Sequence, residues 1–98
     1  MKEKAGLFKA LSDPHRLMII ERLLAGETCS CTLIEGLPIT QPTLSHHLKL
    51  LTDVGLITSK KEGTWKKYHV NMDKIEMLIR YLSALKTIEV TQLGGCRV

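Results

Sequence analysis

Two of the chain's three cysteines stand two residues apart in the run Cys29-Ser30-Cys31. Thiolates are soft ligands, so a pair at this spacing suits As(III), Sb(III), Cd(II) or Cu(I) better than hard ions. The thiolate is the form that binds, and a helix beginning at this point would favour it over the thiol. The sequence therefore predicts a soft-ion or metalloid site at Cys29 and Cys31.

The third cysteine, Cys96, follows Gly94-Gly95 near the end of the chain. The glycines would give its thiol a flexible tether, while the alternative reading is an incidental thiol in a frayed tail. Three cysteines in a reducing compartment are expected as free thiols, ligands or redox sensors rather than as a disulfide framework. Oxidation of a thiol to a disulfide or sulfenic acid stays open as an alternative to metal binding.

A helix with a polar and basic face is predicted after the cysteine pair. Thr40 is its N-cap, and Pro42 is tolerated in its first turn. With a rotation of about 100° per residue, the apolar side chains of this helix fall on one face and polar or basic side chains fall on the opposite face. The apolar stripe consists of Leu44, Leu48 and Leu51, and the opposite face of Ser45, His46 and Lys49. His47 is expected at the edge of the core.

Basic residues concentrate in this region. Lys and Arg outnumber Asp and Glu by 14 to 10 over the whole chain. Residues 41–70 carry Lys49, Lys60, Lys61, Lys66 and Lys67 against only Asp53 and Glu62. Such a zone suits a phosphate backbone, although charge alone also fits a solvated surface.

The elements that position these residues follow from local signals, and 98 residues fit one domain. A helix is predicted over about 3–11, and a second over 14–25, where Asp13-Pro14 supplies a start and Leu17, Ile20 and Leu24 share a face. Further helices are predicted over roughly 30–36 and 41–55. A hairpin follows over 56–70, with a turn at Gly63. Asn71 is the predicted cap of a last helix over about 72–90.

The predicted fold class is therefore mainly α with a small β-hairpin, in the order α-α-α-α-β-β-α. Two short helices joined by a tight turn, the second with a polar outer face, form a helix-turn-helix pattern over about 30–54. The apolar stripe of the last helix is the predicted dimer seam, because so small a core is often completed by a second copy. The alternative is that the stripe only closes the core of the single chain. Its partners would be the apolar residues of the first helix. The predicted interface is Leu7, Phe8, Leu11, Ile75, Leu78, Ile79, Leu82 and Leu85.

Four segments together resemble the ArsR/SmtB family of winged-helix metal-responsive repressors, most closely its arsenic-responsive members. They are the run from Phe8 to Leu17, the Cys29-Ser30-Cys31 pair, the run from Gln41 to Leu51, and the exit Gly55-Leu56-Ile57 into a basic hairpin. The likeness covers nearly the whole chain. It implies one winged helix-turn-helix domain over 1–98, with dimerisation helices at about 3–11 and 72–90.

The resemblance further implies a homodimer bound to a two-fold operator upstream of resistance genes, and release when the inducer binds. It makes 41–51 the recognition helix, which agrees with the ability of a major groove to accept an α-helix. The base-contact candidates are Gln41, Thr43, Ser45 and His46. The phosphate-contact candidates are Lys49, Lys60, Lys61, Lys66 and Lys67, which would give affinity without sequence preference.

As(III) or Sb(III) is the expected inducer, with no permanently bound cofactor. The family pattern places a third cysteine three residues after the pair, where this chain has Ile34. Cys96 or a small thiol would then complete the site. In an intact helix, residues two apart point roughly 200° from each other, so capture by both sulfurs is expected to distort the first turn of the 30–36 helix.

Other readings remain at this point. A cadmium- or lead-type sensor would also use a Cys-x-Cys pair, generally with an N-terminal cysteine that is lacking here. A zinc site on the last helix is disfavoured because residues 72–90 hold no histidine. An enzyme is disfavoured because no oxyanion loop or phosphate-binding glycine motif occurs. No run approaches the roughly 20 apolar residues of a membrane span, so a cytoplasmic protein is expected.

Overall fold

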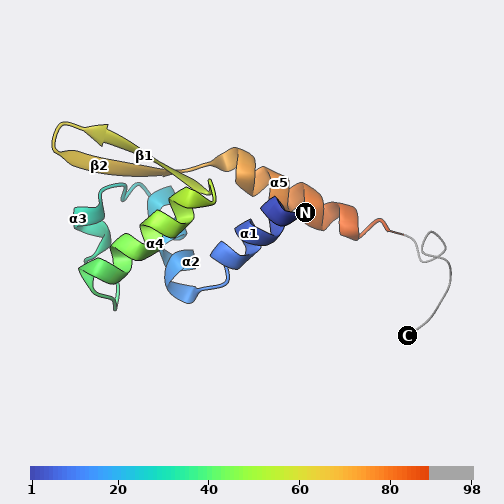
Figure 1. Cartoon of the computed structure of the whole chain (residues 1–98), viewed down its shortest axis with the longest axis horizontal. Helices are drawn as coiled ribbons and strands as arrows, with labels where there is room; N and C mark the ends of the chain where they lie inside the picture. Colours follow the sequence, from blue (N-terminus) through green and yellow to red (C-terminus); the bar gives the residue numbers. More distant parts are fainter. Residues whose placement is uncertain (89–98) are drawn as a thin grey trace.

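The computed structural model describes residues 1–88 and has the predicted order of elements. The helices and strands are α1 (Lys2–Ala10), α2 (Pro14–Leu24), α3 (Ser30–Leu33), α4 (Gln41–Asp53), β1 (Ile57–Glu62), β2 (Trp65–Val70) and α5 (Met72–Leu85). In Figure 1, α1 and α5 lie side by side at one end, while α3, α4 and the β1–β2 hairpin gather at the other. No helix within residues 1–88 is long and apolar enough to cross a membrane.

Side-chain caps start three of the helices where the sequence predicts them. The Asp13 carboxylate accepts the His15 and Arg16 amides at the start of α2. The Thr40 hydroxyl accepts the Thr43 amide at α4, and Asn71 accepts the Asp73 amide at α5. Each cap satisfies amides that the first turn leaves without a partner, so a short local signal is enough to set the helix start.

Two helices are shorter than predicted. The third ends at Leu33 rather than near residue 36, and Gly36 follows with a φ of +81°, a conformation that glycine adopts without strain. The last ends at Leu85, and residues 89 and 90 of the predicted span lie outside the described part of the chain.

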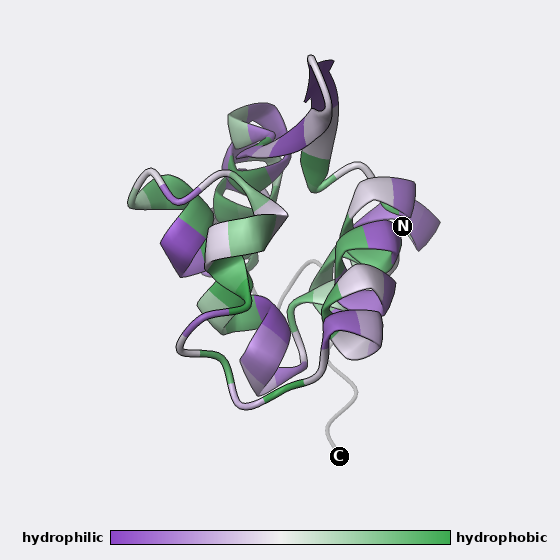
Figure 2. Ribbon diagram, turned by 90° about the vertical axis from the view of Figure 1, so that its left-hand side faces the viewer, coloured by the Kyte–Doolittle hydropathy of each residue, from purple (hydrophilic) through white to green (hydrophobic). Residues whose placement is uncertain are grey.

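One apolar core joins the two ends of the molecule. Figure 2 shows hydrophobic colour on the sides of the helices that face one another and hydrophilic colour on the outer half of the hairpin. The α4 stripe is confirmed, because Leu44, Leu48 and Leu51 are all buried. The largest fully buried side chains are Leu7, Ile19, Leu33, Leu44, Leu51, Leu56 and Ile57.

The predicted buried face of α2 is wrong at two of its three positions. Ile20 is buried, but Leu17 is 44% exposed and Leu24 is 57% exposed, and the helix instead buries Ile19 and Leu23. Apolar residues surround most of this helix, so their spacing does not select one face. The packing partners select it, as tertiary context commonly does.

The two strands pair in register from Ile57 opposite Val70 to Glu62 opposite Trp65, around a turn at Gly63. A third segment joins them. The Tyr68 amide donates to the Thr28 carbonyl at 2.9 Å, and Cys29 forms an antiparallel bridge with Lys67. The chain just before α3 is therefore fastened to β2 through the main chain.

Arg16 ties α1, α2 and α4 together. Its guanidinium donates from Nε to the Ala10 carbonyl at 2.7 Å, and Nη1 lies 3.3 Å from Nδ1 of His47. His47 is only 7% exposed, which confirms its predicted place at the core edge. Burial lowers the pKa of His47, and the positive charge of Arg16 adds to this effect while the Asp13 carboxylate opposes it.

The pKa of Asp13, at the same junction, is lowered although burial acts to raise it. Partial burial raises its pKa, but the amide hydrogen bonds from Arg16 and His15, with the charge of Arg16, outweigh burial and leave the pKa below its ordinary value. Asp13 is therefore held as a carboxylate while the neighbouring His47 is held neutral.

The corrected face of α2 leads to a stability prediction. We expect Ile19→Ala to lower the free energy of unfolding by about 2–5 kcal/mol, because it opens a cavity in the core. Leu24→Ala, on the exposed side of the same helix, is expected to change it by less than about 1 kcal/mol. Urea unfolding at one fixed protein concentration measures both. A loss in Leu24→Ala that equals or exceeds the loss in Ile19→Ala would contradict this assignment of the buried face.

His47 leads to a prediction about pH. Because its pKa is lowered by folding, the unfolded chain binds the proton more tightly, and stability is lost as pH falls below the ordinary histidine pKa of about 6.5. We expect this decline in the free energy of unfolding between about pH 7.5 and 5.5 to be smaller in His47→Asn, which removes the titrating group. The exposed neighbour offers the matched control, His46→Asn, which should keep the decline. Identical profiles for the natural chain and His47→Asn would contradict the assignment.

Candidate nucleic-acid interface and cysteine pair

The outer face of α4 presents every residue predicted to contact bases. Gln41, Thr43, Ser45 and His46 are all exposed. Ser45 and His46 lie opposite the buried stripe together with Lys49, whose ammonium group is 3.0 Å from the Asp53 carboxylate. The Thr43 hydroxyl already accepts from Thr40 at 3.0 Å, so it is partly engaged in the cap.

The hairpin separates its four lysines onto two faces. Residues directly opposite each other in the register point to the same side, and neighbours along a strand alternate. The pair Lys61 and Lys66 therefore shares one face with Ser59 and Tyr68, while Lys60 and Lys67 lie on the other. Lys67 is half-buried there and pairs with Glu62 at 3.1 Å.

A polar hollow lies between α4 and the hairpin face that carries Lys61 and Lys66. Because the hairpin is the predicted wing, this hollow is called the α4–wing groove. It has a volume of about 340 Å³. Its lining is drawn from α3, α4 and both strands, and consists of Ser30, Ser45, Leu48, Lys49, Thr52, Asp53, Ser59, Lys66 and Tyr68. The α4 helix and the hairpin, which are both predicted to contact DNA, thus share one concave surface. Ser30, the residue between Cys29 and Cys31, lies on the same surface.

Cys29 and Cys31 lie together, but not in the way that helical spacing predicts. Cys29 precedes the helix as its N-cap, with extended backbone angles of −92° and 134°, and its sulfur accepts the Cys31 amide at 3.4 Å. A cap side chain folds back over the first turn, so the two sulfurs meet on one side of it. The premise that both cysteines lie in an intact helix is therefore wrong, since only Cys31 is a helical residue. A distortion of the first turn on capture of an ion stays a prediction.

The two cysteines are joined by a disulfide in this structure, with their Cα atoms 5.3 Å apart. This differs from the expectation of free thiols. A disulfide cannot act as a thiolate ligand, so the form able to bind a soft ion is the reduced one. Cys96 lies outside the described residues, and its predicted role as a further ligand stays a prediction.

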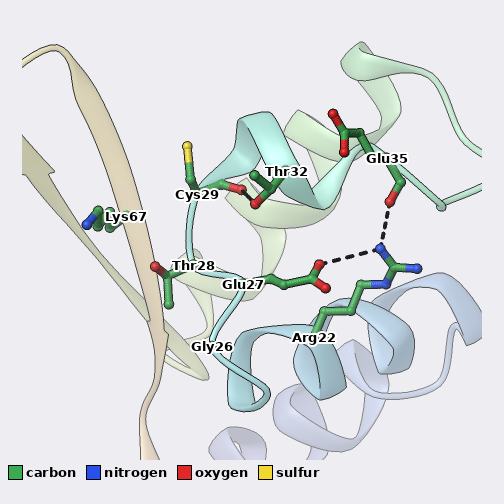
Figure 3. A pocket seen from close by; sticks show the side chains of 8 residues that line it. All are labelled: Arg22, Gly26, Glu27, Thr28, Cys29, Thr32, Glu35 and Lys67. Atoms are coloured by element: carbon green, nitrogen blue, oxygen red, sulfur yellow. Dashed lines mark hydrogen bonds and ion pairs between the residues drawn. The ribbon is translucent and has the colours of Figure 1, made fainter.

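A second hollow, of about 520 Å³, opens beside the Cys29 main chain (Figure 3). Arg22 forms an ion pair with Glu27 at 3.5 Å and donates to the Glu35 carbonyl at 2.6 Å, and these groups make up one wall. Lys67 faces them from β2, while the Cys29 side chain points away from the Arg22–Glu27 pair. Cys29 is among the residues that line this hollow, and Cys31 is not.

The structure also brings together Asp13, His15 and His47, with one ligand atom from each within 4.8 Å of the others. Sequence reasoning missed this group, because His47 comes from a different helix. The Arg16 guanidinium beside His47 places a positive charge where a cation would bind, and Asp13 already accepts two amides. The group therefore serves to join α2 to α4.

The predicted dimer residues divide between the core and the surface. Leu7 and Leu78 are buried within the single chain, and Phe8, Leu11 and Ile75 are half-buried. Ile79, Leu82 and Leu85 remain about half exposed along the outer face of α5. The exposed apolar surface predicted for a dimer seam is therefore concentrated on these last three residues.

The groove also contains residues that sequence reasoning did not select, namely Ser30, Thr52, Ser59 and Tyr68. The alternation of side chains along the hairpin could have grouped Ser59 and Tyr68 with Lys66. Nothing in the sequence indicated Ser30, because its place in the groove depends on the bridge between residue 29 and β2.

The sequence profile described as "Bacterial regulatory protein, arsR family" matches residues 13–59. The chain is 41% identical over 86 residues to the "Arsenical resistance operon repressor" of Staphylococcus xylosus, covering 88% of this chain and 83% of the relative. The "Probable mercury resistance operon repressor" of Streptomyces lividans is 32% identical, and the match covers 94% of this chain and 74% of the relative. The "Cadmium resistance transcriptional regulatory protein CadC homolog" of Staphylococcus aureus is 35% identical, and the match covers 92% of this chain and 74% of the relative.

Solved structures share the fold. An "ArsR-like Transcriptional Regulator from Rhodococcus sp. RHA1" superposes with a TM-score of 0.76 at 29% identity, covering 87% of this chain and 80% of the other. A Mycobacterium bovis domain, described as homodimeric and winged helix-turn-helix, superposes with a TM-score of 0.71 at 24% identity, covering 87% and 80%. Together with the relatives above, these likenesses show that the chain belongs to the arsR family of bacterial regulatory proteins, which are DNA-binding transcriptional regulators of winged helix-turn-helix fold and not enzymes.

Proposed function

We propose that this chain is a homodimeric, cytoplasmic repressor of an arsenical resistance operon. It binds a two-fold operator through α4 and the hairpin, and As(III) or Sb(III), captured by reduced Cys29 and Cys31, releases it. The observation that carries the proposal is the cap position of Cys29, which brings both sulfurs to one side of the first turn of α3. The names of the relatives support arsenic as the inducer.

DNA binding is supported by the way the exposed groups are arranged. The base-contact candidates Gln41, Thr43, Ser45 and His46 lie at the start of the recognition helix, where side chains reach base edges in the major groove. Lys49 and the hairpin lysines would neutralise phosphates on either side of that groove. In a two-fold dimer, the same surfaces would be presented twice to the two halves of the operator.

Dimer formation is supported by the half-exposed apolar row on α5. Ile79, Leu82 and Leu85 would be covered by the same residues of a second copy, since a two-fold interface uses one surface twice. The homodimeric relative of known structure has the same architecture.

The inducer is proposed to bind two thiolates from this chain and a third ligand from elsewhere. As(III) favours sulfur, and only two thiols are present within residues 1–88. Cys96 or a small thiol would supply the third. Mercury- and cadmium-resistance regulators among the relatives make other soft ions the alternative inducers.

The proposal is tested by DNA affinity, measured by fluorescence anisotropy under reducing conditions. The probe is a labelled duplex spanning the region directly upstream of the gene for this chain. We expect arsenite to weaken binding of the natural chain by roughly 5- to 150-fold, the usual range of allosteric coupling. The Cys29→Ser/Cys31→Ser variant should bind the duplex equally well with and without arsenite, because it lacks both thiolates.

Two further arms sharpen this test. Cys96→Ser, matched in chemistry, shows whether the third thiol contributes to release. Antimonite and cadmium, added in place of arsenite, establish the selectivity. Undiminished release of the double variant by arsenite would exclude the cysteine pair as the sensor, and release by cadmium but not by arsenite would assign a different inducer.

A thiol-redox sensor of the same fold is the second candidate, favoured by the disulfide between Cys29 and Cys31. Hydrogen peroxide would take two electrons and two protons from the two thiols, forming the disulfide and two molecules of water. The same assay separates the two functions. A redox sensor requires the oxidised and reduced chains to differ in DNA affinity without any metalloid, whereas an arsenite sensor requires release of the reduced chain.

A further inference from the structure

The α4–wing groove has the chemistry of a binding site for a single phosphate. Two ammonium groups line it, from Lys49 on α4 and Lys66 on β2. Hydroxyl-bearing side chains of Ser30, Ser45, Ser59 and Tyr68 also line it and can donate hydrogen bonds, whereas the Thr52 hydroxyl already donates to the Leu48 carbonyl at 2.7 Å. Such side chains are the ones that contact phosphate oxygens in protein–DNA interfaces.

The charge in the groove is positive after its one carboxylate is counted. Asp53 also lines the groove, and it is paired with Lys49 at 3.0 Å. Lys66 is in none of the ion pairs found within residues 1–88. Its ammonium group therefore supplies the net attraction for an anion, while the hydroxyls supply the geometry.

The position of the groove favours a phosphate of the DNA backbone as the occupant. One wall is the recognition helix, carrying the base-contact candidate Ser45, and the other is the hairpin face that carries Lys66. A helix lying in the major groove has a phosphate strand along each flank. The strand on the hairpin side of α4 would pass over this hollow.

We propose that the α4–wing groove binds one backbone phosphate of the DNA and that Ser30 is one of the groups that hold it. This inference rests on the proposed function. It places a DNA contact between the two sensor residues, since Ser30 separates Cys29 from Cys31 in the chain.

The main chain makes this contact sensitive to the inducer. Thr28 accepts the Tyr68 amide at 2.9 Å, and Cys29 pairs with Lys67, so residues 28–30 are held against the strand that carries Lys66 and Tyr68. An ion bound by Cys29 and Cys31 is attached on both sides of Ser30. Any change that it makes in this three-residue segment moves a phosphate contact directly, without unfolding α3.

The test compares two acidic substitutions on opposite sides of α3. Ser30→Asp places a carboxylate in the groove, whereas Thr32→Asp places the same charge two residues later, where Thr32 lines the other hollow with Arg22 and Glu35. Both substitutions keep the two cysteines and add an acid to the first turn of a helix, where it is tolerated. We expect Ser30→Asp to lower affinity for duplex DNA by 10-fold or more at about 0.1 M salt. Thr32→Asp should stay within threefold of the natural chain.

A second measurement does not depend on one variant folding normally. Lys66→Gln should reduce the slope of log affinity against log salt by about 0.9 for each phosphate that the lysine no longer neutralises. If Ser30 and Lys66 hold the same phosphate, the decreases in affinity from Ser30→Asp and Lys66→Gln will be non-additive in the double variant. The decreases from Thr32→Asp and Lys66→Gln should add.

The outcomes separate this inference from the proposed function. A natural chain that binds neither its upstream duplex nor a random duplex overturns the proposed function. A natural chain that binds DNA while Ser30→Asp and Thr32→Asp bind equally, or while Ser30→Asp and Lys66→Gln add, overturns the phosphate site alone.

Discussion

The pairing of residues 28 and 29 with β2 is the interaction on which the arrangement of the site depends. Through the Tyr68 amide and the isolated bridge between Cys29 and Lys67, a short segment before α3 is fastened to the edge of the two-stranded hairpin. A two-stranded hairpin by itself is only marginally stable in water, so this contact supports it. The same contact sets the cysteine pair beside the hairpin, so the proposed sensor and the proposed DNA-binding surface are parts of one small unit.

The start of α3 is built to respond to a ligand. Most caps in this chain are oxygen atoms of Asp, Thr or Asn, but the cap of α3 is the sulfur of Cys29, a weak hydrogen-bond acceptor. The helix that it caps has only four residues. The cap hydrogen bond is present while Cys29 is joined to Cys31, and the weak cap and the short helix offer little local stability to oppose a change at this point. By contrast, the junction of α2 with α4 is held by Arg16, Asp13 and His47, which keeps the recognition helix in place while the segment before α3 changes.

The sequence predicted the features that depend on local chemistry. Caps at Asp13, Thr40 and Asn71, the Leu44–Leu48–Leu51 stripe and the hairpin with its turn at Gly63 all require only near neighbours in the chain. It did not predict features that depend on packing between elements. The buried side of α2 was wrong at Leu17 and Leu24 because apolar residues surround that helix. Two features of the site depend on pairing with β2, which is distant in the chain: the place of Ser30 in the groove and the cap role of Cys29. In that pairing Cys29 is bridged to Lys67, and the Thr28 carbonyl accepts the Tyr68 amide.

The central claim is that an ion held by Cys29 and Cys31 acts on DNA binding through the main-chain contact with β2. Hydrogen exchange of the Tyr68 amide, followed by NMR on the reduced chain without DNA, tests it most directly, because this amide donates to Thr28. Arsenite is expected to speed exchange at Tyr68 severalfold while amides in the middle of α5, such as that of Leu78, keep their rates. Unchanged exchange at Tyr68 in a protein that arsenite nevertheless releases from DNA would contradict the claim and direct attention to another route between the two sites.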